Sequence, residues 1–235
     1  MICLAFDTSA KVASAAVLDG EKVLAAYSID NGLTQSELIL PMAEDMMKKL
    51  GLSYSDVELL CTSVGPGSFT GVRIGVSLVK GLAFGKNISC VGVSTVEALA
   101  ENLRGLSGVI IPVMDARRNQ VYTATFLSDG ENITRTCSDR AISLTQLAEE
   151  LRGVTENIYL VGDGYNVAKK ALTELGIKLS ETPEILRNEN AISVGRVGIK
   201  KQEAGESVKD LEISPVYLRL PQAERERLER LGNNK

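Results

Sequence analysis

The chain opens with three short apolar runs separated by turn residues. The runs cover residues 1–6, 12–18 and 22–27, and the pair Asp19-Gly20 lies between the second and the third. An Asp-Gly pair between two alternating runs is a strong signal for a two-residue hairpin. The pattern therefore predicts three antiparallel strands at the start of the chain.

A helical pattern follows these strands. The sequence TQSE at residues 34–37 forms a capping box, apolar side chains recur with helical spacing over 39–50, and Gly51 is a stop signal. Pro41 lies inside this pattern and predicts a kink or a late start of the helix. Further strands are predicted over 57–64 and 88–93, and helices over 72–84 and 94–103. Strands that alternate with helices at this spacing favour parallel pairing.

The same plan starts again after residue 108. Strands are predicted over 109–114, 121–126 and from Ile133, with the Asp129-Gly130 turn before the last; a helix over 144–151, a strand over 158–161 and a helix over 167–175 follow. The break at 104–108 divides the chain into a first lobe, residues 1–105, and a second lobe with a helical tail, residues 106–235.

This duplicated arrangement, three strands followed by a βα unit, is that of actin-like ATPases and sugar kinases. We therefore predict an α/β protein with the actin-like ATPase (ASKHA) fold. It has two lobes of RNase H-like topology, of which the second is reduced, and a ligand cleft between them.

The end of the chain is helical and polar. A helix is predicted over 191–202, residues 215–219 are extended, and residues 223–231 alternate Glu and Arg around Leu228 and Leu231. Such a terminal stretch is either a solvated helix or a helix that docks on a partner.

The composition narrows the possible chemistry. The chain is 44% hydrophobic and 24% charged, and it contains no histidine. The lack of His excludes Ser-His-Asp and Cys-His catalysis and every metal site that needs a His ligand. The net charge of −4 leaves no electrostatic footprint for holding nucleic acid without a partner.

Cysteine usage and hydropathy indicate the compartment. The four cysteines lie far apart and form no Cys-x-x-Cys motif, which favours free, buried thiols in a reducing cytoplasm. The longest apolar runs are far shorter than the ~18 to 20 residues of a membrane span. We expect a cytoplasmic protein with neither a membrane segment nor a signal peptide.

Residues 65–71, with the sequence GPGSFTG, are the most unusual local feature. Glycine-rich turns between a strand and a helix let backbone N–H groups approach an anion at the helix N-terminus. The spacing matches neither the Walker A motif nor the dinucleotide fingerprint. Two interpretations remain open: a weak anion contact through Gly67, Ser68 and Thr70, or a tight structural turn in which Thr70 caps the next helix. Arg73, one turn into that helix, could clamp an anion or a partner's carboxylate.

The turn after the first strand of each lobe is a candidate phosphate loop. In an active actin-like phosphotransferase this turn holds hydrated Mg²⁺ through an Asp and admits the phosphate at a glycine. Asp7 and Thr8 occupy this place, yet no glycine occurs before Ser14, and the second turn presents Asp115 and Arg117 in place of a backbone cradle. We expect a noncatalytic protein, and an active small-molecule kinase or ATPase that uses Asp7 and Asp115 around Mg²⁺ is the alternative.

An apolar stripe runs along the predicted helix that ends at Gly51. It contains Met42, Met46 and Met47 together with Ile39 and Leu50. Such a stripe is more often core, yet Met-rich surfaces adapt well to partners. Both interpretations remain open.

Six segments in order along almost the whole chain form a larger pattern. They are Asp7-Thr8-Ser9, QSELILP at 35–41, VGPGSFTGVRIG at 64–75, VSTVEAL at 93–99, DARR at 115–118 with Val121-Tyr122, and PVYLR at 215–219. Together they closely resemble the bacterial TsaB family, also called YeaZ. The segment at 64–75 is far more specific than a generic glycine loop.

The resemblance implies a noncatalytic relative of TsaD, the enzyme that transfers the threonylcarbamoyl group to the adenosine 3′ of the anticodon in tRNAs reading codons that begin with A. TsaD binds its metal through a pair of histidines, which this chain lacks. TsaB-like proteins pair with TsaD through helices of the first lobe, and the ATPase TsaE joins the assembly. The family was once labelled a glycoprotease, a label that the lack of His makes wrong here.

The implied partners are TsaD in a heterodimer, TsaE, and a second copy of the chain when it is isolated. Contact with tRNA is expected only through the complex. This chain alone is expected to bind no cofactor, whereas ATP or ADP and Mg²⁺ belong to the complex with TsaD and TsaE.

Carried onto this sequence, the resemblance implies a docking surface on the first two helices. Its residues are Gln35, Glu37, Leu40, Met42, Met46, Met47, Phe69, Arg73 and Leu78. Many relatives have a His where this chain has Gln35, so any contact of that imidazole must be replaced or lost. The weak anion or nucleotide contacts are expected at Asp7, Thr8, Gly67, Ser68, Thr70 and Arg117.

Overall fold

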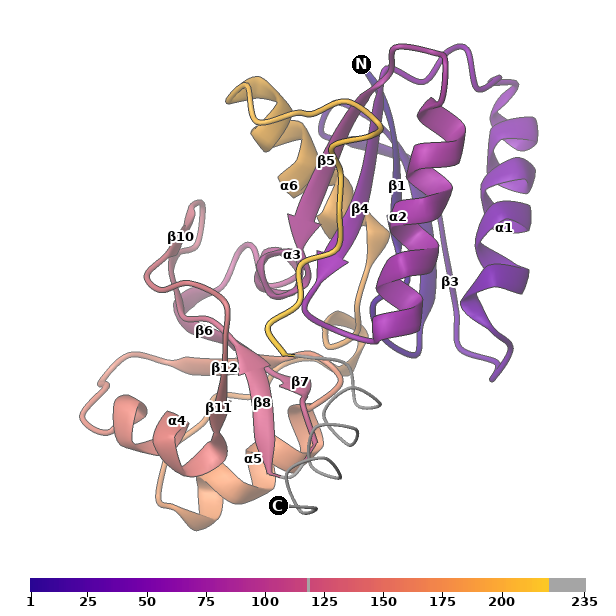
Figure 1. The fold of residues 1–235 in the computed structure, drawn as a ribbon. Helices are drawn as coiled ribbons and strands as arrows, with labels where there is room; N and C mark the ends of the chain where they lie inside the picture. The colour runs from indigo at the N-terminus through magenta and orange to yellow at the C-terminus, as the bar shows by residue number, and fades with distance from the viewer. Residues whose placement is uncertain (118, 220–235) are drawn as a thin grey trace, which may run out of the picture.

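The computed structural model describes residues 1–117 and 119–219, which form two lobes (Figure 1). The chain passes between the lobes three times, in residues 102–106, 187–191 and 213–219. No helix within the described ranges is long and apolar enough to span a bilayer.

Five strands form the sheet of the first lobe, in the order β3-β2-β1-β4-β5. They are β1 (Ile2–Asp7), β2 (Ala13–Asp19), β3 (Lys22–Ile29), β4 (Leu59–Gly65) and β5 (Ser89–Ser94). The first three strands are antiparallel, whereas β4 and β5 continue the sheet in parallel with β1. The predicted antiparallel opening and its parallel continuation are therefore confirmed.

Helices cover both faces of this sheet (Figure 1). α1 (Gln35–Leu50) and α2 (Phe69–Ala83) lie on one face, and α3 (Thr95–Glu101) and α6 (Ala191–Glu203) lie on the other. Successive side chains of a strand point to opposite faces. Along β1, Leu4 and Phe6 therefore join the core beneath α1 and α2, while Cys3 and Ala5 join the core beneath α6.

The ends of α1 follow the local sequence closely. The Glu37 Oε2 atom accepts a hydrogen bond from the backbone N–H of Thr34 at 3.0 Å, which completes one half of the predicted capping box. Gly51 ends the helix in the left-handed region, with φ of 67°. Because α1 already begins at Gln35, the late start predicted from Pro41 is wrong, and Pro41 lies inside the helix.

α2 begins earlier than the predicted residue 72. The Ser68 Oγ atom accepts a hydrogen bond from the backbone N–H of Gly71 at 3.2 Å, so Ser68 is the N-cap. The prediction that Thr70 caps this helix is wrong, because Thr70 lies within its first turn.

α6 packs very close to the sheet of the first lobe. A Cβ atom added at Gly195 would lie 2.6 Å from a Leu18 methyl carbon, and one at Gly198 would lie 2.2 Å from the Cys61 sulfur. The helix itself is as predicted, although it belongs to the stretch grouped with the second lobe in the sequence. Its small side chains let it return to the first lobe.

The second lobe repeats the first with broken strands. Its two sheets have the orders β10-β9-β6-β12 and β11-β8-β7. The strands are β6 (Ser107–Pro112), β7 (Met114–Asp115), β8 (Gln120–Thr123), β9 (Phe126–Asp129), β10 (Ile133–Arg135), β11 (Arg140–Ser143) and β12 (Ile158–Val161). The order β10-β9-β6-β12 repeats β3-β2-β1-β4, with β12 parallel to β6, so the predicted duplication is confirmed.

The breaks in these strands differ from the prediction. The single strand predicted over 121–126 is wrong, because it is interrupted between β8 and β9. At the break, Thr125 pairs with Thr136, whose backbone N–H donates a hydrogen bond to the Thr125 carbonyl at 2.9 Å. β11 was not predicted. The helix α4 (Leu144–Leu151) and the strand β12 have the predicted bounds, and α5 (Tyr165–Glu174) begins slightly earlier than expected.

All four cysteines are free thiols. Cys3, Cys61 and Cys90 are buried, and Cys137 is partly buried. The prediction of buried core thiols is confirmed for the first three.

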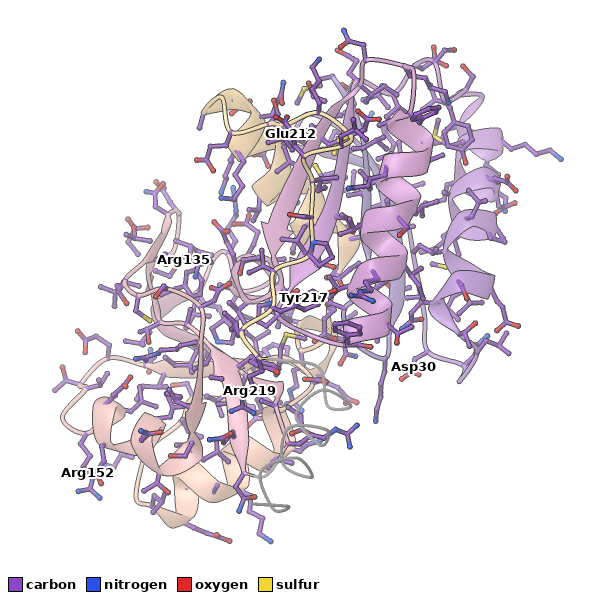
Figure 2. All side chains as sticks on the ribbon, in the orientation of Figure 1. Asp30, Arg135, Arg152, Glu212, Tyr217 and Arg219 are labelled. Carbon is purple, nitrogen blue, oxygen red and sulfur yellow. The ribbon has the colours of Figure 1, made fainter. Side chains whose placement is uncertain are left out.

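The last described residues lead from the first lobe to the second. The backbone N–H of Val216 donates to the carbonyl of Val64 at 2.7 Å, and Arg219 donates to the carbonyl of Ala116 at 3.1 Å. We call residues 213–219 the strap; Figure 2 shows Tyr217 beside α2 and Arg219 at the second lobe. The helix predicted over 223–231 lies outside the described residues.

Candidate functional site

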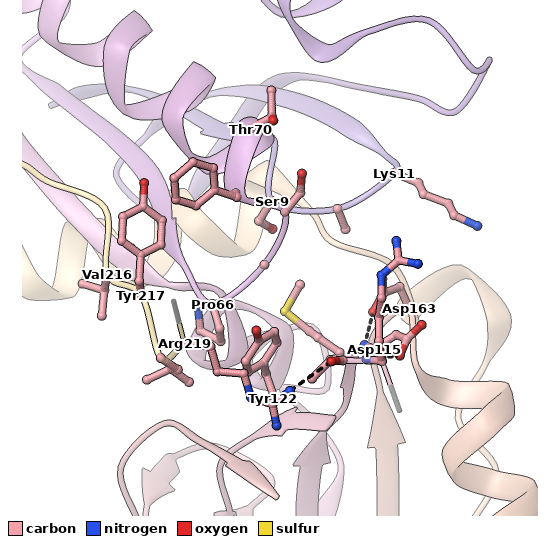
Figure 3. Close-up of a pocket in the computed structure, with 18 residues that line it drawn as sticks. Ser9, Lys11, Pro66, Thr70, Asp115, Tyr122, Asp163, Val216, Tyr217 and Arg219 are labelled. Carbon is pink, nitrogen blue, oxygen red and sulfur yellow. Dashed lines mark hydrogen bonds between the residues drawn. The ribbon is translucent and has the colours of Figure 1, made fainter. Parts of the chain in front are cut away.

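A cleft of about 570 Å³ lies between the lobes (Figure 3). Most of its lining comes from residues 9–11, 66–70, 114–117 and 216–219 and from Asp163. These segments are the turns that follow β1, β4, β7 and β12, together with the strap. The duplicated fold thus brings corresponding turns of both lobes to one place.

The glycine loop closes on the first turn. The backbone N–H of Ser68 donates to the carbonyl of Ser9 at 2.7 Å. A Cβ atom added at Gly67 would lie 2.5 Å from the same carbonyl oxygen. An anion cradle needs free N–H groups, and the N–H of Ser68 is engaged by the Ser9 carbonyl. This geometry favours the tight structural turn of the two interpretations.

The later glycines of the motif allow α2 to approach β1 and β4. A Cβ atom added at Gly71 would lie 2.0 Å from the carbonyl oxygen of Thr8, and one at Gly75 would lie 2.5 Å from the Thr62 hydroxyl oxygen. The Thr8 hydroxyl donates to the Gly71 carbonyl at 2.7 Å. Residues four apart lie on one face of a helix. The conspicuous glycine spacing is therefore a packing device.

Asp7 lies beneath the cleft and is fully buried. Its Oδ1 atom accepts hydrogen bonds from the Ser9 backbone N–H at 2.9 Å, the Ser9 hydroxyl at 2.6 Å and the Ser63 hydroxyl at 2.9 Å. Its Oδ2 atom is buried and has no partner among the described residues. Burial raises the pKa of the Asp7 carboxyl, and the hydrogen bonds from Ser9 and Ser63 act against this rise.

The six predicted anion contacts divide into two groups. Gly67, Ser68, Thr70 and Arg117 line the cleft. Asp7 and Thr8 are buried, and Thr8 uses its hydroxyl to hold α2. The structure thus brings only part of the expected set to the cleft surface.

Two carboxyl groups near the cleft were not singled out in the sequence. Asp163 follows β12, and its Oδ1 atom accepts a hydrogen bond from the Asp115 backbone N–H at 3.0 Å (Figure 3). Glu189 is only 2% exposed, and its burial, reinforced by the charges of Asp163 and Asp7, raises the pKa of Glu189 to about 8. The turn Gly162-Asp163-Gly164 signals the first of these residues, but no local pattern signals Glu189.

An aromatic stack holds the strap against the start of α2. The rings of Phe69 and Tyr217 stack with centroids 4.8 Å apart, and the Arg73 guanidinium lies 3.9 Å from the centroid of Phe69. The Arg73 Nε–H donates to the Tyr217 hydroxyl at 2.7 Å. Arg73 is therefore engaged within the chain, and Tyr217, from the PVYLR segment, joins the site although the sequence alone does not predict it as a site residue.

Comparison with known proteins identifies the family. Residues 34–226 match the model of the family described as TsaD, tRNA N6-adenosine threonylcarbamoyltransferase. The tRNA threonylcarbamoyladenosine biosynthesis protein TsaB of Bacillus subtilis is 30% identical over 226 residues, which cover 95% of this chain and 96% of the relative. This chain belongs to the TsaB family.

Solved structures agree with the fold of this TsaB homologue. YeaZ from Pseudomonas aeruginosa superposes with a TM-score of 0.76 at 23% identity and covers 92% of this chain and 99% of its own. A ROK hexokinase from Thermus thermophilus gives a TM-score of 0.50 at 12% identity over 87% of this chain and 100% of its own. The fold is the actin-like ATPase fold predicted from the sequence.

The residues expected on the docking surface of this TsaB homologue differ in exposure. Glu37 and Arg73 are exposed, and Leu40, Phe69 and Leu78 are half-buried. Met42, Met46 and Met47 are 5%, 0% and 3% exposed and pack in the core between α1 and the sheet. Their assignment to an exposed docking face is corrected, because the apolar stripe of α1 turns toward β2 and β3.

Gln35 makes hydrogen bonds at the start of α1. Its side-chain amide donates to the carbonyls of Ala10 at 2.5 Å and Lys11 at 3.0 Å. These bonds tie the start of α1 to the turn that lines the cleft.

Proposed function

We propose that this chain is a noncatalytic cytoplasmic subunit that pairs with TsaD and TsaE. In this role it supports threonylcarbamoyl transfer to the adenosine 3′ of the anticodon in tRNAs that read codons beginning with A. Relatives that are tRNA threonylcarbamoyladenosine biosynthesis proteins support the pathway. In this role TsaD performs the chemistry, and the complex contacts the tRNA.

One observation carries the noncatalytic assignment. The backbone N–H of Ser68 donates a hydrogen bond to the Ser9 carbonyl, and Gly67 packs against the same oxygen. In an active phosphotransferase of this fold the turn after β1 admits the phosphate at a glycine, whereas in this chain that turn has no glycine before Ser14 and its Ser9 carbonyl is bonded to the start of α2. The turn thus joins β1 to α2, which suits a rigid partner for another subunit.

The exposed side of α1 and α2 supports the choice of docking surface. Glu37, Leu40, Phe69, Arg73 and Leu78 are accessible there to different degrees. The same surface on a second copy would form a twofold homodimer when TsaD is absent. Nucleotide and Mg²⁺ are then held by the complex and not by this chain alone.

Reconstitution tests the proposal. The chain is combined with its cognate TsaD and TsaE, tRNA and threonylcarbamoyl-AMP, and transfer is measured with each protein omitted in turn. Loss of transfer on omission of this chain, with no product from this chain alone, is the expected result. Nucleotide turnover by this chain alone that disappears in Asp7→Asn would instead establish the kinase or ATPase alternative.

A further inference from the structure

The second crossing of the chain between the lobes, residues 187–191, is held by a hydrogen bond at each end, and these two bonds are its clamps. The backbone N–H of Gly162 in the second lobe donates to the Arg187 carbonyl at 2.7 Å, and the Ala191 backbone N–H donates to the Ser14 hydroxyl of the first lobe at 3.0 Å. Glu189 lies midway between these two clamps. Any change in the separation of the lobes therefore acts directly on the surroundings of Glu189.

The first crossing is tied to the second at the same place. The Asn102 side-chain amide, at the end of α3, donates to the carbonyls of Leu186 at 3.0 Å and Asn188 at 2.7 Å. The Ser193 hydroxyl donates to the Asn102 Oδ1 atom at 2.6 Å. The two crossings thus form one joint, and Glu189 is inside it.

An acidic group of each lobe acts on Glu189. After burial, the charges of Asp163, in the turn after β12, and of Asp7, at the end of β1, raise the pKa of Glu189, while the backbone N–H groups of Glu189 and Asp163 act against this rise. The Oε1 atom of Glu189 and the Oδ2 atom of Asp7 are both buried without a hydrogen-bond partner among the described residues. An ionised carboxylate in such surroundings is costly, and like charges add to that cost.

Among the described residues, the charges of Asp115 and Lys11 act on this cluster at Asp163. Asp115 raises the pKa of Asp163 by its charge, and Lys11 lowers it, while burial is the largest cause of its rise. Lys11 is exposed to solvent at the mouth of the cleft. Its charge is therefore screened and does not neutralise the buried carboxyls.

We propose that Glu189 is a proton-binding site whose occupancy sets the separation of the two lobes. With the proton bound, Glu189 is neutral and the joint closes around it. When the proton leaves, Glu189 carries a charge between Asp7 and Asp163, and repulsion and the gain of hydration open the joint. Because Asp163 also lines the cleft, the opening widens the cleft that holds the turns of both lobes.

A distance measurement between the lobes tests this proposal. Spin labels are placed at Ser77→Cys on α2 and Val167→Cys on α5, two exposed positions, in a Cys137→Ser background. The other three cysteines are buried. Double electron-electron resonance is recorded from pH 6 to pH 9.5 in buffers with EDTA, which excludes divalent cations as the cause. The expected result is a longer distance at high pH, with a midpoint near 8.

Three variants make the test specific. Glu189→Gln keeps the shape of the neutral side chain, so the distance is expected to stay at its low-pH value throughout. Asp163→Asn removes one like charge and is expected to move the midpoint to lower pH. Glu184→Gln, an exposed position in the same connection, is expected to behave as the parent chain does.

Infrared spectroscopy reads the proton itself and does not require movement. A protonated-carboxyl band that is present at pH 7, lost at pH 9.5 and missing in Glu189→Gln is the expected result. The proposal is overturned if no such band belongs to Glu189, if the parent distance is constant with pH, or if Glu189→Gln opens as the parent does.

Discussion

The hydroxyl of Thr8 donates a hydrogen bond to the carbonyl oxygen of Gly71 at 2.7 Å, across the contact between the end of β1 and the first turn of α2. At the same contact, a Cβ atom on Gly71 would lie 2.0 Å from the Thr8 carbonyl oxygen. Two backbones therefore meet with no space for a methyl group. This contact explains why the motif after β4 requires glycine.

Gly71→Ala is expected to lower the free energy of unfolding by roughly 2 to 4 kcal/mol, because the obstructing atom is backbone and cannot turn away. Gly81→Ala on the same helix is the matched control. A Cβ atom at Gly81 has no neighbour within 4 Å, so alanine should stabilise α2 by roughly 0.5 to 1 kcal/mol. Urea unfolding compares the midpoints of the two variants, provided that the m value, the dependence of the free energy of unfolding on urea concentration, is the same for both. Equal midpoints for both variants would show that the close approach does not exist in solution.

A charge on the outer side of α1 or α2 should weaken pairing with TsaD. Leu40→Arg and Leu78→Arg are each expected to raise the dissociation constant by a factor of ten or more, about 1.4 kcal/mol, at a temperature where circular dichroism shows each variant to be folded. Calorimetric titration measures the affinity, and Val167→Arg, an exposed apolar position of the second lobe, should bind as the parent does. Undiminished affinity of both folded variants would place the TsaD surface elsewhere.

Met46→Glu should act differently from these surface variants. Met46 is fully buried in the core under α1. A carboxylate there has no partner, so this variant is expected to lose several kcal/mol of stability, on the order of 3 to 5. Thermal unfolding followed by circular dichroism measures the melting temperature of Met46→Glu, which is expected to fall well below those of the surface variants.

Removal of Arg73 should loosen the strap. Its contact with the Phe69 ring and its hydrogen bond to Tyr217 together contribute roughly 1 to 2 kcal/mol, so Arg73→Ala should speed amide exchange at Val216 by a factor of about 5 to 30. Hydrogen exchange with mass spectrometry measures this segment. Arg152→Ala, on an exposed arginine of the second lobe, should leave the rate unchanged. Faster exchange in both variants would contradict a local role for Arg73.

The stability of the chain should fall as pH rises through the titration of Glu189. In the unfolded chain the pKa of this group returns to its ordinary value of 4.5, whereas burial raises the folded pKa to about 8. Between these values the folded state binds more protons, so the free energy of unfolding decreases with pH. Below pH 4.5 the contribution of the neutral group is fully present, and it is lost by pH 8.

Glu189→Gln should remove this slope. At pH 9 the variant is expected to melt roughly 2 to 6 °C above the parent, about 1 to 2 kcal/mol, and at pH 4.5 the two should melt together. Scanning calorimetry at both pH values measures the difference, with Glu184→Gln as the exposed control. A parallel pH dependence of the parent and Glu189→Gln would show that Glu189 is ionised in the folded chain.

Elements that depend on neighbours in the chain could be predicted closely. The Asp19-Gly20 hairpin, the capping box at 34–37, and the bounds of α4 and β12 all follow from turn residues, caps and periodicity. The breaks in the second lobe could not be predicted. Strand periodicity continues through Ala124 and Thr125, whereas in the structure β8 ends at Thr123 and Thr125 forms hydrogen bonds with Thr136 and Cys137 after β10.

The sequence by itself determined the order of the elements, the duplicated plan, the absence of histidine chemistry and, through the motif at 64–75, the family. Turns, caps and periodicity are local, so residues close in the chain suffice to specify them. Only the tertiary structure decided that the methionines of α1 are core, that the glycine loop closes on Ser9, and that Glu189 is buried in the connection between the lobes. Each of these facts depends on which surfaces pack together across long stretches of chain, and the periodicity of one segment carries no information about the segment that covers it.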